Sequence, residues 1–243
     1  MTDEEVAMEL AKPGRIEELR ARLADVSHFM KALCEHIARR ANLEDGRQGA
    51  FFESRFKCRE LIGEGPILLC GIYVDLNQIR AREANTPEES THTSAYDRIV
   101  AWKKAQTTDS PFREATQQAP PDGWMSALTL DERTGAYDGS APSVNGRRAS
   151  DKGLLPIQFE EYLKLLDWTG RQVHAKKRGA IPEHLAPILE RIGVNAALWT
   201  ELVTEFDRRF SHVVGTAQAL ADRAATAGRR WYHGRARCAE AFG

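Results

Sequence analysis

Apolar side chains recur every three or four residues over a long stretch near the start of the chain. The stretch contains Ile16, Leu19, Leu23, Val26, Phe29, Leu33 and Ile37. This spacing places the side chains on one face of an α-helix. We therefore expect an amphipathic helix of unusual length, interrupted near Ser27, and a chain that is mainly helical.

The segment after this helix changes character. Gly46 and Gly49 break the pattern, and the sequence AFFESRFKCRELI, from Ala50 to Ile62, mixes aromatic and charged residues. It predicts one or two short strands or extended segments. A second helix is expected to start at Pro66, a good first helical residue, and to run through Tyr73 to Arg82.

The last third of the sequence is again helical in pattern. Helices are expected from Phe159 to a stop at Gly170, before Gly193, after a cap at Asn195 and after a cap at Thr216. The fold class is therefore mainly α, with at most a small sheet and a C-terminal helical bundle. The predicted domains are 1–104, which ends in a short helix over 94–104, a flexible linker over 105–153, and a helical domain over 154–243.

Composition narrows the possible functions. The 243 residues carry 34 Lys and Arg against 35 Asp and Glu, a net charge of −1. This balance excludes a wholly basic nucleic-acid coat but allows a local basic patch. The acidic start and the lack of a long apolar run predict a cytoplasmic protein without a membrane span. The four cysteines, which form no C-x-x-C pair, are expected to be reduced thiols.

Tyr73, Asn77 and Arg80 follow one another at helical spacing and are expected on one helix face. A phenol and a guanidinium placed together can attack and hold a phosphate. The alternative is a half-buried tyrosine that serves packing, beside a solvated arginine.

The segment from Arg47 to Arg59 alternates cations with aromatic rings. Arg55, Lys57 and Arg59 can follow a phosphate backbone while the phenylalanines stack on unpaired bases. The alternative is an ordinary strand with one apolar and one charged face. No His-x-His or H-E-x-x-H pattern occurs among the seven histidines, so no metal site is expected in this chain.

Two stretches together resemble a known family. FFESRFKCREL, followed by GPILLCGIYVDLNQIRA, is similar to the second half of the catalytic domain of single-tyrosine HUH transposases, in particular the repeat-associated tyrosine transposases of bacteria. That family has a Tyr-Ile/Val-x-x-Asn-Pro-x-Arg-Ala helix. Here it reads from Tyr73 to Ala81, with Gln78 at the position of the proline.

The resemblance implies cleavage and rejoining of single-stranded DNA through a phosphotyrosine. Tyr73 would be the catalytic nucleophile, and Arg55, Lys57, Arg59, Asn77 and Arg80 would bind DNA. The expected partners are single-stranded or hairpin DNA and a second subunit, in a homodimer or a mixed dimer. The complete family enzyme uses a divalent metal, Mg²⁺ or Mn²⁺, held by a His-hydrophobic-His pair that this sequence lacks, so no cofactor is expected to bind this chain.

The resemblance also predicts a helical remnant of an α+β catalytic domain, incomplete on its own, with an apolar patch exposed where strands would have covered it. Three functions remain open. The chain could be a transposase-like protein that performs strand transfer alone or in a mixed dimer. It could be an inactive remnant that only binds DNA, or a helical interaction domain without a nucleic-acid role.

Overall fold

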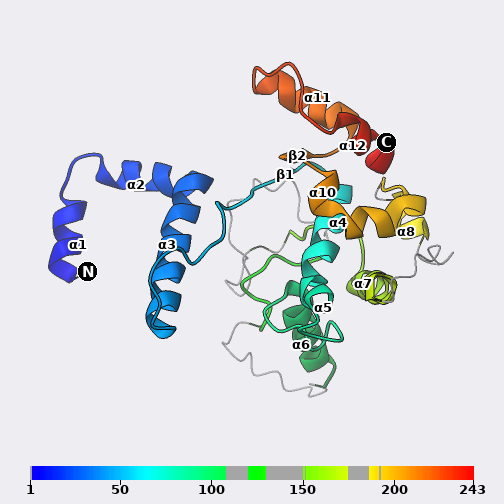
Figure 1. Ribbon diagram of the computed structural model, residues 1–243, viewed down its shortest axis with the longest axis horizontal. Helices are drawn as coiled ribbons and strands as arrows, with labels where there is room; N and C mark the ends of the chain where they lie inside the picture. The colour runs from blue at the N-terminus through cyan, green and yellow to red at the C-terminus, as the bar shows by residue number, and fades with distance from the viewer. Residues whose placement is uncertain (1, 108–119, 130–149, 151, 175–185, 192) are drawn as a thin grey trace. The chain divides into compact units, whose positions relative to one another are not determined.

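The computed structural model describes residues 2–107, 120–129, 150, 152–174, 186–191 and 193–243. Within them the chain is mainly helical, as the sequence predicts, and its only sheet has two short strands (Figure 1). The residues form two compact units, Met1–Cys58 and Arg59–Gly243. None of the described helices combines the length and the apolar character that a bilayer crossing requires.

The first unit consists of three helices: α1 (Asp3–Leu10), α2 (Arg15–Ala24) and α3 (Val26–Glu44). The long amphipathic helix is thus interrupted, at Asp25. The Asp25 carboxylate accepts a hydrogen bond of 2.8 Å from the backbone N–H of His28 and caps α3. The interruption predicted near Ser27 is therefore confirmed, two residues earlier.

No residue described between 2 and 58 is buried. Twelve of the sixteen exposed large hydrophobic residues of the described chain belong to this unit, among them Leu23, Phe29 and Leu33. Apolar side chains are therefore exposed over this unit, and their covering by absent strands stays a prediction. Of the predicted segment from Ala50 to Ile62, only β1 (Glu60–Leu61) forms a strand, and 50–59 contain none.

The second unit begins with β1, which pairs in parallel with β2 (Val213–Val214), Glu60 opposite Val213 and Leu61 opposite Val214. Helix α4 follows at Glu64–Asp75, so that Pro66 is its third residue rather than its first. The helical path is broken at Leu76 and resumes as α5 (Asn77–Ala81). Helix α6 (Ser94–Thr107) then forms where a short helix is predicted.

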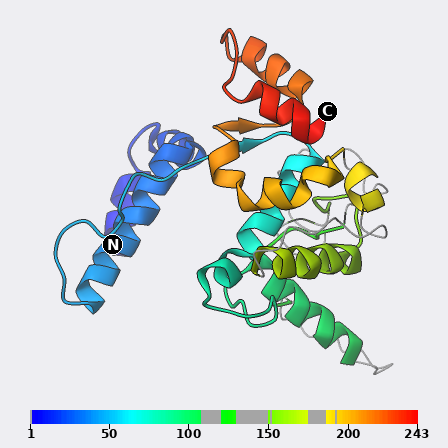
Figure 2. The ribbon, with the colours of Figure 1, turned by 45° about the vertical axis from the view of Figure 1, so that its right-hand side comes forward.

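The remaining helices complete the second unit. They are α7 (Phe159–His174), α8 (Ala186–Arg191), η2 (Ala196–Leu198), α9 (Trp199–Thr204), α10 (Phe206–Arg209), α11 (Ala217–Thr226) and α12 (Arg235–Phe242). Asn195 and Thr216 cap the turns that follow them, as predicted. Helices α11 and α12 lie side by side (Figure 2).

Gly170 does not end its helix, and α7 continues to His174. A Cβ atom at position 170 would lie 3.1 Å from Cδ2 of Leu76. The glycine therefore allows α7 to approach the junction of α4 and α5 closely, which explains a glycine inside a helix.

The core of the second unit joins residues from both predicted outer domains. Leu68, Leu69 and Ile72 from α4 pack in one cluster with Leu165, Leu166 and Trp199. The compact units consequently divide at residues 58 and 59, and not at the predicted bounds of 104 and 154.

The predicted linker, 105–153, is described only in part. Residues 108–119, 130–149 and 151 lie outside the described residues, while Met125 and Leu128 are buried. The guanidinium of Arg98 donates a hydrogen bond of 2.9 Å to the carbonyl oxygen of Ser126. The part of this segment that the structure describes therefore belongs to the fold of the second unit.

A buried carboxylate connects three helices of this unit. Asp75, 1% exposed, accepts hydrogen bonds from the Ser94 hydroxyl at 2.8 Å and from the Tyr162 hydroxyl at 2.5 Å. Burial, and next the negative charge of Asp75, raise the pKa of Tyr162 well above its usual value. The phenol is therefore a neutral donor at physiological pH.

Replacement of Tyr162 by Phe is expected to destabilise the protein by about 1–3 kcal/mol, because the buried Asp75 carboxylate loses a donor. The change should appear in the urea concentration at the midpoint of unfolding. Tyr96→Phe is the matched control, since the Tyr96 hydroxyl has no hydrogen-bond partner within the described chain. Equal midpoints for the two variants would contradict the role of Tyr162.

Candidate functional site

Tyr73 lies in the last turn of α4, half-buried, with its ring 5.0 Å from the ring of Phe206 at the start of α10. The guanidinium carbon of Arg80, from α5, lies 4.7 Å from the centroid of the Tyr73 ring. Such a position is a cation–π contact. The structure thus brings Tyr73 and Arg80 together, as their spacing predicts.

The hydroxyl of Tyr73 donates a hydrogen bond of 2.6 Å to Oδ2 of Asp207, in α10. Desolvation is the main cause of a raised pKa for Tyr73, followed by the hydrogen bond to Asp207 and its negative charge. The positive charge of Arg80 acts in the opposite direction but does not reverse the shift. The phenol is consequently protonated near neutral pH.

Arg59 holds Asp207 in this position. Its Nη1 lies 2.5 Å from Oδ1 of Asp207, its Nη2 donates to the carbonyl oxygen of Asp207 at 2.9 Å, and its Nε donates to the carbonyl oxygen of Ser211 at 3.1 Å. The side chain is only 19% exposed. The structure therefore gives Arg59 a positioning role within the fold, and its role in DNA binding stays a prediction.

The hydrogen-bond donors of Arg80 are only partly satisfied by the protein. Its Nη2 donates to the carbonyl oxygen of Thr204 at 3.1 Å, whereas its Nη1 is buried and has no hydrogen-bond partner within the described chain. A buried donor without a partner is costly, because it has lost its hydrogen bonds to water. The described chain therefore leaves one of the Arg80 donors unsatisfied.

Asn77 is exposed as the first residue of α5, and within the described chain its side chain makes no hydrogen bond to Tyr73 or Arg80. Arg55 and Lys57 belong to the first unit, where both are exposed. The predicted surface that joins these two cations to Tyr73 stays a prediction.

The phenylalanines of the first unit are exposed beside these cations. Phe51, Phe52 and Phe56 are 44%, 42% and 37% exposed. Their alternation with charges cannot come from a half-buried strand, because no strand forms there. The structure therefore excludes the interpretation of this segment as an ordinary strand with one apolar face.

Sequence reasoning missed Asp207. It lies 134 residues from Tyr73 along the chain, within a short acidic and basic stretch that offers no recognisable motif. Only the packing of α10 against α4 brings the two side chains together. No local signal in the sequence could have identified this partner.

A divalent metal does not fit the residues around Tyr73. No group of three or more His, Cys, Asp or Glu side chains in the described chain could hold an ion. The carboxylate that contacts the phenol is already paired with Arg59. We therefore derive no step through a metal bound by this chain.

Replacement of Asp207 by Asn is expected to lower the pKa of Tyr73, because it removes the negative charge that disfavours the phenolate. The pKa of Tyr73 is measured from the ultraviolet absorbance of the phenolate as the pH is raised. Subtraction of the same titration of Tyr73→Phe isolates the signal of Tyr73. An unchanged titration in Asp207→Asn would contradict the contact.

Comparison of the chain with models of protein families, with curated proteins and with solved structures finds no match. The function is therefore argued from the residues and their geometry.

Proposed function

We propose that this chain is a transposase-like protein that binds single-stranded or hairpin DNA. The observation that carries the proposal is the exposed segment 51–57, in which three exposed phenylalanines stand close in sequence to Arg55 and Lys57. Exposed aromatic rings next to cations suit unpaired bases and their phosphates. In the second unit, Arg80 and the exposed Asn77 provide further polar contacts for a strand.

The state of Tyr73 supports binding more than independent catalysis. A nucleophilic phenol must lose its proton, yet burial and next the neighbouring Asp207 raise the pKa of Tyr73. The described chain contains no group of three or more side chains that could hold a metal ion. DNA binding is therefore the primary function that we propose, with strand transfer dependent on groups supplied from elsewhere.

The binding proposal predicts a salt-dependent affinity for single-stranded oligonucleotides. Each cation that contacts a phosphate should contribute about 0.7 to the slope of log affinity against log salt concentration. Arg55→Gln and Lys57→Gln should each reduce the slope by that amount in fluorescence anisotropy. Arg39→Gln is the matched control, because Arg39 is exposed and paired with Glu35. If no oligonucleotide binds at low salt, DNA binding is excluded, and a helical interaction domain without a nucleic-acid role is the function that remains.

One contact favours strand transfer as a second candidate function. The Tyr73 hydroxyl, the Asp207 carboxylate and Arg59 form a chain of nucleophile, proton acceptor and orienting group. In the reaction, the phenol oxygen would bond to phosphorus while its proton passes to Asp207. The bond from phosphorus to the leaving sugar oxygen would break, and that oxygen would take a proton from water.

This candidate predicts a covalent protein–DNA adduct when hairpin DNA is incubated with the protein and Mn²⁺ or Mg²⁺. The adduct should be absent in Tyr73→Phe and reduced in Asp207→Asn, as read by denaturing electrophoresis. Tyr232→Phe serves as the control, because Tyr232 lies outside this cluster. Equal adduct in Tyr73→Phe would exclude Tyr73 as the nucleophile.

A further inference from the structure

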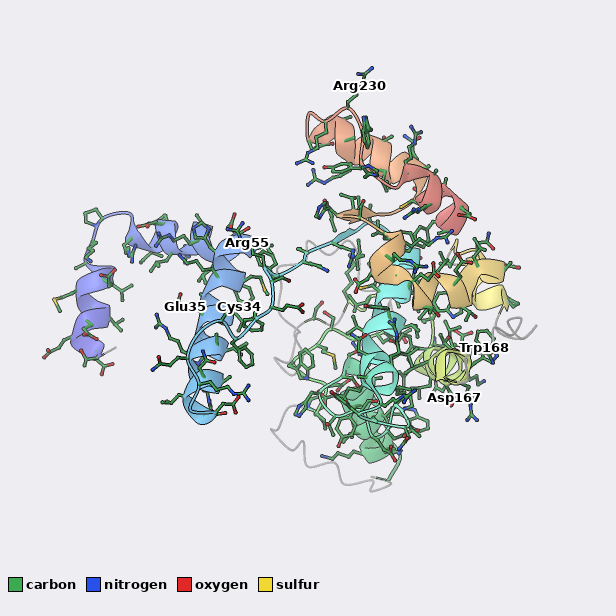
Figure 3. The ribbon with its side chains drawn as sticks, viewed as in Figure 1. Cys34, Glu35, Arg55, Asp167, Trp168 and Arg230 are labelled. Atoms are coloured by element: carbon green, nitrogen blue, oxygen red, sulfur yellow. The ribbon has the colours of Figure 1, made fainter. Side chains whose placement is uncertain are left out.

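The first unit contains a pocket that involves none of the residues around Tyr73. Its volume is about 670 Å³, within the range of roughly 300–1,000 Å³ that small-molecule sites occupy. It lies between α3 and the segment that follows it (Figure 3, where Cys34 and Arg55 are labelled). Its main lining residues are Met30, Lys31, Cys34, Phe52, Arg55 and Phe56.

The apolar part of the lining suits a flat aromatic group. Phe52 and Phe56 come from one segment, and Met30 and Cys34 come from successive turns of α3. Aromatic rings favour offset or edge-to-face contact with another ring, and a methionine adapts to the edge of such a group. An aliphatic ligand would gain less from two phenyl rings.

The charged part of the lining suits an anion. Lys31 and Arg55 are its two charged residues, and both are cations. Within the described chain neither has an ion-pair partner. Glu35, one turn after Lys31, pairs instead with Arg39. Ser27 and Ser54 add hydroxyl groups that can donate to an oxygen anion.

We propose that this pocket binds one nucleotide, its base against Phe52 and Phe56 and its phosphate at Lys31 and Arg55. A ring and an anion in one small molecule match both halves of the lining. The nucleotide can be free or can be an unpaired position of a DNA strand. If the nucleotide is part of a DNA strand, the inference rests on the proposed function. If the nucleotide is free, the inference is independent of that function.

The thiol of Cys34 gives a direct probe of occupancy. Cys34 lines the pocket, whereas the exposed Cys58 does not. Burial raises the pKa values of Cys70 and Cys238, so both should react slowly with an alkylating reagent. Brief alkylation of the full chain with iodoacetamide, read by peptide mass spectrometry, therefore compares Cys34 with Cys58 in one sample.

We expect deoxyadenosine monophosphate to slow the alkylation of Cys34 and to leave that of Cys58 unchanged. At a concentration ten times the dissociation constant the rate should fall about tenfold, with the fraction of empty pocket. Arg55→Gln and Phe56→Leu should weaken this protection. The controls Arg47→Gln and Phe29→Leu make the same changes at exposed positions that do not line the pocket.

A comparison of the mononucleotide with a single-stranded oligonucleotide distinguishes a free nucleotide from a nucleotide within DNA. Protection by the mononucleotide supports a free ligand, and protection only by a single-stranded oligonucleotide supports a nucleotide within DNA. No protection by either, equal protection by inorganic phosphate, or equal slowing at Cys58 would overturn the proposal. An oligonucleotide that binds in anisotropy without protecting Cys34 refutes the pocket alone. A mononucleotide that protects Cys34 when no oligonucleotide binds refutes the proposed function alone.

Discussion

The second unit depends on the buried carboxylate of Asp75. A buried charge is tolerated only when donors surround it, since its desolvation costs several kcal/mol. The donors come from the start of α6, through Ser94 and the backbone N–H of Ala95, and from Tyr162 in α7. These helices must therefore stay packed on the end of α4. Because Tyr73 lies two residues before Asp75, the same constraint fixes the turn that carries the phenol.

The surroundings of Tyr73 combine opposing charges. Asp207 favours the neutral phenol, while Arg80 favours the phenolate, and burial adds to the effect of Asp207. Arg59 neutralises Asp207 and ties it to the backbone of 207–211. An anion that approached Arg80 would compete with the face of the Tyr73 ring for the guanidinium.

Local signals in the sequence identified the helices but not their partners. The caps at Asn195 and Thr216 and the pairing of Tyr73 with Arg80 follow from short-range rules of side-chain chemistry and helical period. Gly170 was expected to end a helix because its role depends on Leu76, far away in the sequence. Arg59 resembled a surface cation because its acceptors, from Asp207 to Ser211, lie about 150 residues later. Long-range contacts of this kind leave no periodic trace, so the sequence could not show them.

The first unit presents a different physical problem. Its three helices bury none of their described side chains, although apolar residues follow α2 and α3 at regular spacing. Isolated helices of this length are marginal in water, and most helical stability in proteins comes from packing of the apolar face. Contacts that cover these apolar faces would therefore add to the stability of the unit. A ligand held between α3 and Phe56 would supply buried contacts that the unit lacks by itself, so binding and folding of this unit should be coupled.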